Sequence, residues 1–191
     1  MFSDGVFAIV VTLLVLELRV PPLQHASDPR ELLHAIVGMR HELLSFALSF
    51  LFVINLWVSH NLFFKMLTRV DDTILWVNNL FLFFVCFVPF PTAVIGAYPQ
   101  NPAAIVLFGL DWMAISIILF TMGRYALVGR LLSEHVDAKR YRQVIQVLGF
   151  LLPLSVVPMA LAYAMPMLAL AIYILMALVG TLLSFRVRLA E

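Results

Sequence analysis

Long apolar stretches separated by short polar ones dominate this sequence. A helix that crosses a membrane needs about 20 mostly apolar residues, and six stretches of the chain reach or approach that length. We therefore predict six spanning helices, at about 3–20, 42–67, 71–98, 103–129, 144–164 and 167–185. The predicted fold is an all-α membrane protein in which residues 1–191 form a single domain.

Prolines and polar residues mark where these stretches end or bend. Pro21-Pro22 follows the first stretch and is expected to stop its helix. A short amphipathic segment at 31–39 is expected to lie at the membrane interface, ahead of the second span. Pro89-Phe90-Pro91 falls in the last third of the third span and predicts a kink there.

The composition excludes a soluble protein. Apolar residues make up 63% of the chain and charged residues 12%, with a mean hydropathy of +1.03, whereas soluble domains average about 45–50% and about 25%. The net charge of +1 gives no electrostatic reason to expect nucleic-acid binding.

The basic residues indicate an orientation in the membrane. With six spans, nine of the 12 Lys and Arg residues fall on the side that holds both termini, and three fall on the other side. Because basic residues accumulate in cytoplasmic loops, we predict that both termini are cytoplasmic.

The first predicted helix combines an ionisable residue with a narrow apolar stripe. Asp4 lies at the start of the helix, where a charge is costly unless it is solvated or paired. At about 100° per residue, Ile9, Leu13 and Leu16 fall within a stripe about 60° wide, with Thr12 at its edge. Such a stripe lines a lumen or packs against another helix. Spacing alone favours packing, with Asp4 as an N-terminal cap.

Other polar residues in the spans are better explained by structure than by catalysis. His60 and Asp4 are both expected near the cytoplasmic end, where they can meet, and a lone membrane histidine is more often a structural hydrogen bonder. Asp111 is expected near the outer end of the fourth span, within reach of water, with Trp112 as an interface anchor. The alternative for Asp111 is an ion-attracting or proton-relay carboxylate.

Three motifs in the first half of the chain resemble those of a known family. They are Phe2-Ser3-Asp4-Gly5-Val6-Phe7-Ala8-Ile9, continued by 12–17, then Trp57-Val58-Ser59-His60, and then Asn78 followed by Pro89-Phe90-Pro91-Thr92. In order and in placement on the predicted helices they are similar to the transmembrane protein 175 family of potassium channels, over roughly residues 1–95. Relatives usually carry an arginine shortly before the Phe-Ser-Asp motif, and a chain starting at Met1 is expected to brace its first helix more weakly.

The resemblance implies that each chain assembles with three further copies of itself into a homotetramer. The first helices of the four chains would line a central pore. It also implies K⁺ as the permeant ion, no cofactor, and a prokaryotic plasma membrane. Ile9, Leu13 and Leu16 are the implied pore and gate positions, and Thr12 is the implied selectivity position. The implied bracing residues are Phe2, Ser3, Asp4, Trp57, His60 and Asn78. These implications reverse the preference for packing that spacing alone gave.

The expected function is therefore a K⁺-permeable channel with modest selectivity over Na⁺. The carbonyl filter of ordinary potassium channels is not recognisable, since 94–98 matches it poorly. The alternative is a secondary transporter of a small cation that uses Asp111 or Asp4 as its coupling carboxylate, although the sequence shows no inverted repeat. A structural scaffold stays open, and an enzyme is not expected because no metal cluster, nucleophile elbow or carboxylate pair is recognisable.

Overall fold

The computed structural model describes residues 2–25 and 27–188, and the regular elements in these ranges are helices. They are α1 (Phe2–Val15), α2 (Pro29–Gly38), α3 (Arg40–Lys65), α4 (Asp72–Phe87), α5 (Pro89–Ala97), α6 (Pro102–Val128), α7 (Ala138–Leu151), the 3-10 helix η1 (Leu152–Ser155), α8 (Val156–Leu161) and α9 (Pro166–Arg188). The predicted all-α class is confirmed in the part of the chain that the structure describes.

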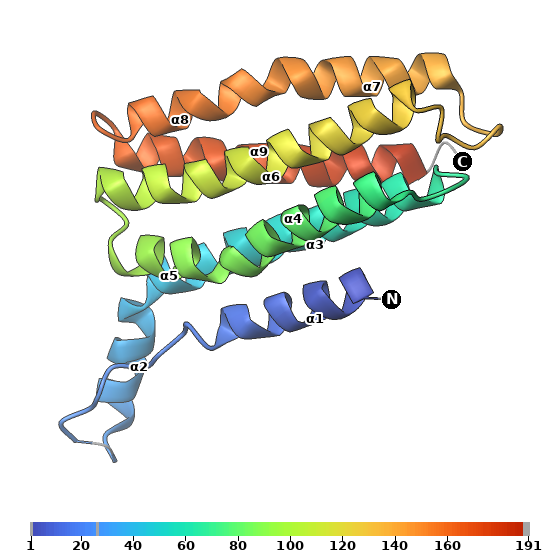
Figure 1. Cartoon of the computed structure of the whole chain (residues 1–191). Coiled ribbons are helices and arrows are strands. Elements are labelled where there is room, and N and C mark those ends of the chain that lie inside the picture. The colour runs from blue at the N-terminus through green and yellow to red at the C-terminus, as the bar shows by residue number, and fades with distance from the viewer. Residues whose placement is uncertain (1, 26, 189–191) are drawn as a thin grey trace.

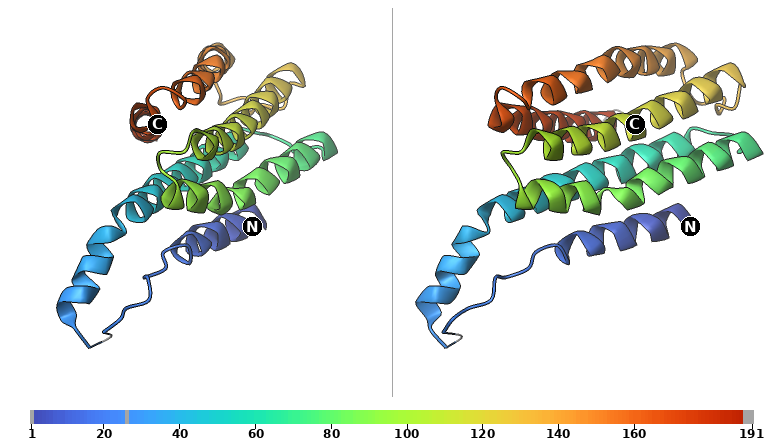
Figure 2. Two further views of the ribbon diagram at one scale, coloured as in Figure 1. Left: turned by 90° about the vertical axis from the view of Figure 1, so that its left-hand side faces the viewer. Right: turned by 60° about the vertical axis from the view of Figure 1, so that its left-hand side comes forward.

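The helices lie side by side in layers that follow the chain order. Figure 1 shows α1 at one edge of the bundle, α3 to α5 next to it, α6 and α9 in the layer after these, and α7 and α8 at the opposite edge. The two further views show the same order, with α2 leaving the bundle at the end where α5 and α6 meet (Figure 2). The layering exposes one whole side of α1 on the protomer.

Among the described residues, three helical segments are long and apolar enough to cross a membrane, namely α3, the run Asp72–Ala97 that comprises α4 and α5, and α6. Shorter apolar helices cover Phe2–Val15, Leu152–Leu161 and Pro166–Val179. The predicted boundaries of the second and fourth spans agree with α3 and α6 to within a few residues. α2 corresponds to the predicted amphipathic segment, and none of its residues is buried.

Two predicted spans have the wrong limits. The first was expected to reach Val20, but α1 ends at Val15. Glu17 and Arg19 bring charges that favour water, and Pro21 disfavours helical geometry in the residue before it. The fifth was expected as one helix, but a 3-10 helix around Pro153 separates α7 from α8, because proline lacks the N–H that an α-helix needs there.

The predicted kink in the third span is confirmed. α4 ends at Phe87, α5 begins at Pro89, and Val88 forms the junction. The Thr92 hydroxyl donates to the Val88 carbonyl at 2.8 Å and shares a buried hydrogen bond of 2.6 Å with the Ser49 hydroxyl of α3. The bend is therefore tied to α3 by polar side chains as well as by packing.

Candidate functional site

α1 has two faces of different character. Phe7, Val10 and Leu14 are 3%, 1% and 0% exposed and belong to the main hydrophobic core. They recur at a spacing of three and four residues, so they form one stripe along the helix. This stripe holds α1 against α3, α4 and α5.

The opposite face of α1 is bare on the protomer. Ile9, Leu13 and Leu16 are 60%, 42% and 61% exposed, so the apolar stripe recognised in the sequence faces away from the rest of its own chain. Leu16 lies just beyond the last helical residue and donates its N–H to the Leu13 carbonyl at 3.0 Å. This face is available either to lipid or to another copy of α1.

Thr12 lies beside this stripe with an exposed side chain. Its hydroxyl donates a hydrogen bond to the Ile9 carbonyl at 2.7 Å. A hydroxyl whose proton is engaged in this way presents only oxygen lone pairs to its surroundings. Thr12 is therefore oriented as an acceptor, which suits contact with a cation.

The start of α1 is held by polar side chains of α3. The Trp57 indole N–H donates to Asp4 Oδ1 at 3.1 Å, and the Asn61 side-chain amide donates to the same oxygen at 3.5 Å. Donors on a neighbouring helix compensate the carboxylate at this position, as an acidic group at the end of a membrane helix requires.

A second polar contact joins the same turn of α1 to α4. His60 Nε2 and Asn78 Oδ1 are 2.7 Å apart, and both residues are only 5% exposed. The Asn78 amide also donates to the Ser3 hydroxyl at 3.4 Å. His60, Asn78 and Ser3 thus connect α3, α4 and α1 in series.

Aromatic rings enclose the His60 imidazole. Phe81 stacks on it with ring centroids 5.5 Å apart and planes 11° apart, and Phe64 lies at 4.6 Å. Phe7 of α1 meets the imidazole edge-on at 5.6 Å. The imidazole is therefore fixed by packing on its faces and by Asn78 at its edge, in keeping with a structural rather than a catalytic histidine.

The structure brings together most of the bracing residues expected from the sequence, with two differences. Phe2 is 73% exposed and does not join the cluster on the protomer. His60 and Asp4 were expected near the same end, where they can meet; their hydrogen bonds given above go to different partners, Asn78 for His60 and Trp57 for Asp4. The role of Asn61 was missed, although it lies one helical turn after Trp57 on the same face.

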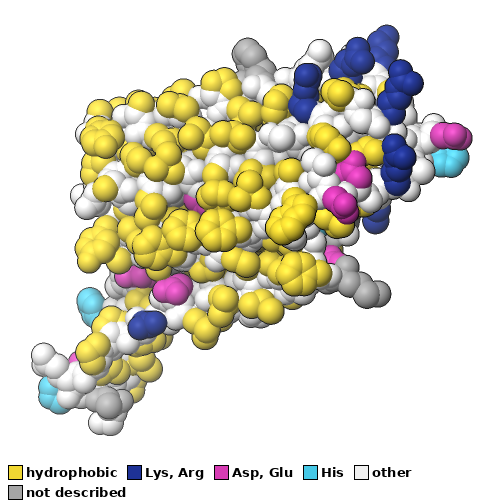
Figure 3. Space-filling view, viewed as in Figure 1, with side chains coloured by type: hydrophobic (Ala, Val, Ile, Leu, Met, Phe, Trp, Pro, Cys, Tyr) yellow, Lys and Arg dark blue, Asp and Glu magenta, His cyan; other side chains and the backbone are white. Residues whose placement is uncertain are grey.

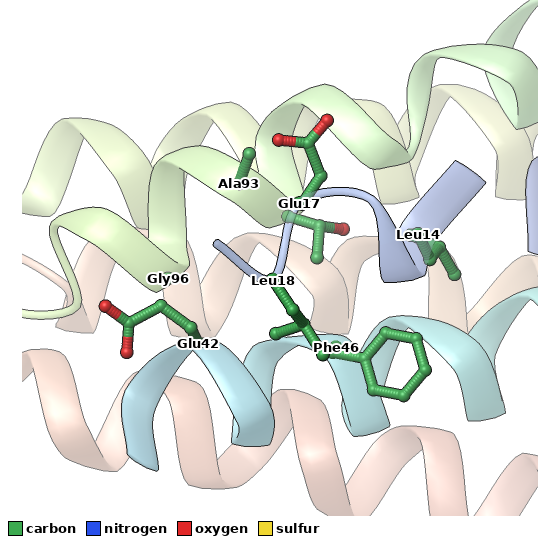
Figure 4. A pocket seen from close by; sticks show the side chains of 8 residues that line it. Leu14, Glu17, Leu18, Glu42, Phe46, Ala93 and Gly96 are labelled. Atoms are coloured by element: carbon green, nitrogen blue, oxygen red, sulfur yellow. The ribbon is translucent and has the colours of Figure 1, made fainter. Parts of the chain in front are cut away.

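At the other end of α1 a small cavity of about 20 Å³ lies between α1, α3 and α5. Figure 4 shows Glu17 and Glu42 at this cavity with their carboxylates turned away from each other. α3 and α5 approach closely here, since a Cβ on Gly96 would lie 3.3 Å from the Glu42 Cα. The cavity has room for about one water molecule, and its two carboxylates do not converge on a common point.

Asp111 and Trp112 are not where the sequence placed them. Asp111 is 4% exposed and its Oδ1 lacks a hydrogen-bond partner among the described residues, so the expected access to water is wrong for the protomer. Trp112 is 8% exposed and stacks on Phe52 at 4.0 Å, so it is a core residue rather than an interface anchor. The cause is the packing of α6 against its neighbours, with Tyr173 of α9 at 5.6 Å from the indole.

The sequence is similar to a known protein family and to curated proteins of that family. A family model described as endosomal/lysosomal potassium channel TMEM175 matches residues 1–89. A potassium channel of Chamaesiphon minutus is 37% identical in an alignment 141 residues long, and the match covers 71% of this chain and 68% of that protein. A potassium channel of Streptomyces collinus is 33% identical in an alignment 187 residues long, and the match covers 93% of this chain and 87% of the relative.

The fold is also similar to a solved structure. The crystal structure of a lysosomal potassium-selective channel TMEM175 homolog from Chamaesiphon minutus superimposes with a TM-score of 0.84 at 30% sequence identity, and the match covers 96% of this chain and 94% of the other. The chain is therefore a multi-pass membrane protein of an ion channel family and not an enzyme. Both the sequence motifs and the fold lead to one conclusion: the chain belongs to the endosomal/lysosomal potassium channel TMEM175 family.

Proposed function

We propose that this chain forms a K⁺-permeable channel as a homotetramer in which four copies of α1 line a central pore. The observation that carries the proposal is the division of α1 into two faces. One face is anchored in the core by Phe7, Val10 and Leu14, and the other presents Ile9 and Leu13 away from the chain. Relatives at 37% and 33% identity are named potassium channels.

The proposed topology has six crossings, formed by α1, α3, α4 with α5, α6, α7 with α8, and α9. The start of α1 and the end of α9 lie at the same end of the bundle (Figure 1), as an even number of crossings requires. Lys and Arg side chains gather at that end (Figure 3). Since basic residues accumulate on the cytoplasmic side, both termini are assigned to the cytoplasm of a prokaryotic cell.

The gate in this proposal is a ring of four Ile9 side chains. Leu13 and Leu16 line the next part of the pore and set its width there. A narrow apolar ring stops ions because water leaves it. Thr12 is exposed and its hydroxyl proton is engaged by the Ile9 carbonyl; in this scheme its oxygen contributes selectivity by coordinating a partly dehydrated cation. Selectivity of K⁺ over Na⁺ is modest in this scheme, because side-chain hydroxyls replace only part of the hydration shell.

The gate assignment is tested by K⁺ flux into liposomes that contain the purified full-length chain. Ile9→Asn places a polar group in the ring and is expected to raise flux, whereas Ile9→Phe narrows the ring and lowers it. Ile117→Asn is the matched control, because Ile117 is an exposed isoleucine of α6, 45% exposed on the protomer. Flux that is unchanged in both Ile9 variants would refute the gate assignment.

The selectivity assignment has an equally close control. Thr12→Val removes the hydroxyl and is expected to lower the K⁺/Na⁺ permeability ratio measured from reversal potentials in bi-ionic solutions. Thr121→Val makes the same change on α6, where the hydroxyl also donates to a carbonyl of its own helix, that of Ile117 at 2.8 Å. A ratio lowered equally in both variants would show that Thr12 has no special role in selectivity.

Absence of K⁺ flux in liposomes that contain the wild-type chain would instead favour a structural scaffold over a channel.

A further inference from the structure

Two loops at the basic end of the bundle are joined to each other. The Thr68 N–H donates to the Leu131 carbonyl at 2.9 Å, and the Ser133 N–H donates to the Met66 carbonyl at 2.8 Å. Leu67 and Leu132 form an antiparallel bridge between the α3–α4 loop and the α6–α7 loop. The pairing fixes the relative positions of side chains that are more than 60 residues apart in sequence.

A small apolar cluster supports these loops from below. Leu131 is 2% exposed and packs with Ile74 and Ala126, which are both fully buried. Arg130, directly before this anchor, has a φ of 53°. That left-handed conformation is usually taken by Gly or Asn, so the loop places an arginine where a smaller residue would be less strained.

A groove of about 510 Å³ lies between the joined loops. The residues that line it are Thr68, Arg69, Arg130, Leu132, Ser133, Glu134 and His135. Each loop thus contributes one arginine and one hydroxyl to the same groove. Guanidinium groups match phosphate oxygens in geometry and charge, and hydroxyls add further donors.

The acidic groups nearby leave the arginines available. Asp71 is close to Arg69, but its carboxylate accepts the Ile74 N–H at 2.9 Å and the Tyr125 hydroxyl at 2.9 Å. These two hydrogen bonds and the charge of Arg69 hold the pKa of Asp71 below its ordinary value. Arg130 makes no ion pair within 4.0 Å of any acid in the described ranges, although Glu134 shares the groove.

We propose that this groove binds a phosphate group, presented by an anionic phospholipid headgroup or by a soluble phosphate ester. The groove lies where α3 ends and α4 begins. The topology proposed above puts this end at the membrane surface, and basic pockets between helices at that level bind anionic headgroups. Further basic residues gather at the same end of the molecule and raise the local concentration of anions (Figure 3). Binding would hold the α6–α7 loop against the loop that joins α3 and α4, the two helices that the His60–Asn78 contact connects.

The test measures binding directly, so its outcome is independent of whether the chain conducts K⁺. Native mass spectrometry of the full-length protein in detergent is performed with phosphatidylglycerol, and separately with glycerol 3-phosphate as competitor. Arg69→Gln and Arg130→Asn each remove one charge from the groove, and Asn suits the positive φ at residue 130, so the loop is preserved. Lys139→Gln is the matched control, an exposed basic residue of α7 outside the groove.

Each arginine variant is expected to bind phosphatidylglycerol about five-fold more weakly than the wild type, while the lysine control is unchanged. Competition by glycerol 3-phosphate assigns the groove to phosphate esters in general, and lack of competition assigns it to the lipid. Equal retention of phosphatidylglycerol by the wild type and the double arginine variant would overturn the proposal. An equal loss in the lysine control would also overturn it, because binding would then follow surface charge rather than the groove.

Discussion

The hydrogen bond between His60 and Asn78 gives a quantitative test of how the chain braces α1. His60→Phe keeps an aromatic ring for the stack on Phe81 but leaves Asn78 Oδ1 without its partner. Asn78→Leu keeps the volume but leaves the imidazole unpaired. Because both residues are only 5% exposed and the bond is short at 2.7 Å, each single change is expected to cost about 1 kcal/mol of unfolding free energy.

The double variant separates pairing from packing. With both partners apolar, no buried group is left unpaired, so most of the loss should be recovered. The coupling energy of the double-mutant cycle is expected at about 1–2 kcal/mol, at the upper end for hydrogen bonds between membrane helices. What remains lost is the 3.4 Å contact from the Asn78 amide to Ser3, worth about 0.5 kcal/mol at that length.

The assay is equilibrium unfolding in mixed detergent micelles, with K⁺ flux of the same variants measured in liposomes. The stability of the double variant should approach that of the wild type, whereas its flux should stay altered because Ser3 has lost its tether. Losses of the two single variants that simply add in the double variant would refute the coupling. The brace would then have to be explained by the aromatic rings around residue 60 alone.

Three further predictions concern other parts of the molecule. Asp111→Asn should leave K⁺ flux about unchanged, because the amide fits the same space; a complete loss of flux would favour a carrier that uses this carboxylate. Asp71→Ala should lower the melting temperature at pH 7, because the carboxylate caps α4. Since a hydrogen bond from a backbone N–H of α4 lowers the pKa of Asp71 below 3.8, this contribution is complete above pH 3.8 and is lost as the pH falls through the folded-state pKa, so variant and wild type should converge in acid. Gly109→Ala should destabilise the protein by about 1–3 kcal/mol in unfolding measurements, because a Cβ would collide with the Tyr173 hydroxyl; Gly38→Ala, where nothing lies within 4 Å, is the control and should not.

Local patterns in the sequence were sufficient for the features that depend on a single helix. The limits of α3 and α6 follow from apolar length, and the bend at Pro89 follows from the missing N–H groups of proline. The grouping of Ile9, Leu13 and Leu16 into one stripe follows from helical periodicity. The exposure of that stripe does not, because spacing alone favoured packing against another helix.

Features that depend on contacts between several helices could not be predicted from local sequence patterns. Asp111 was placed near water because the sequence shows depth along a helix but not which face meets a neighbour. The stack of Trp112 on Phe52 decides that face, and it joins residues 60 positions apart. The bridge between Leu67 and Leu132 is similar, because nothing in either loop alone indicates its partner.

The position of the brace along α1 has a mechanical consequence. The interhelical hydrogen bonds of α1 described above lie at Ser3 and Asp4, so this end acts as a fulcrum. At a rise of about 1.5 Å per residue, Ile9 lies about 8 Å and Leu13 about 14 Å from Asp4 along the axis of α1. A swing of about 10° therefore shifts Leu13 by about 2.4 Å but Ile9 by only about 1.3 Å. In the proposed tetramer, the Ile9 ring would therefore move less than the Leu13 ring when α1 swings about its braced end.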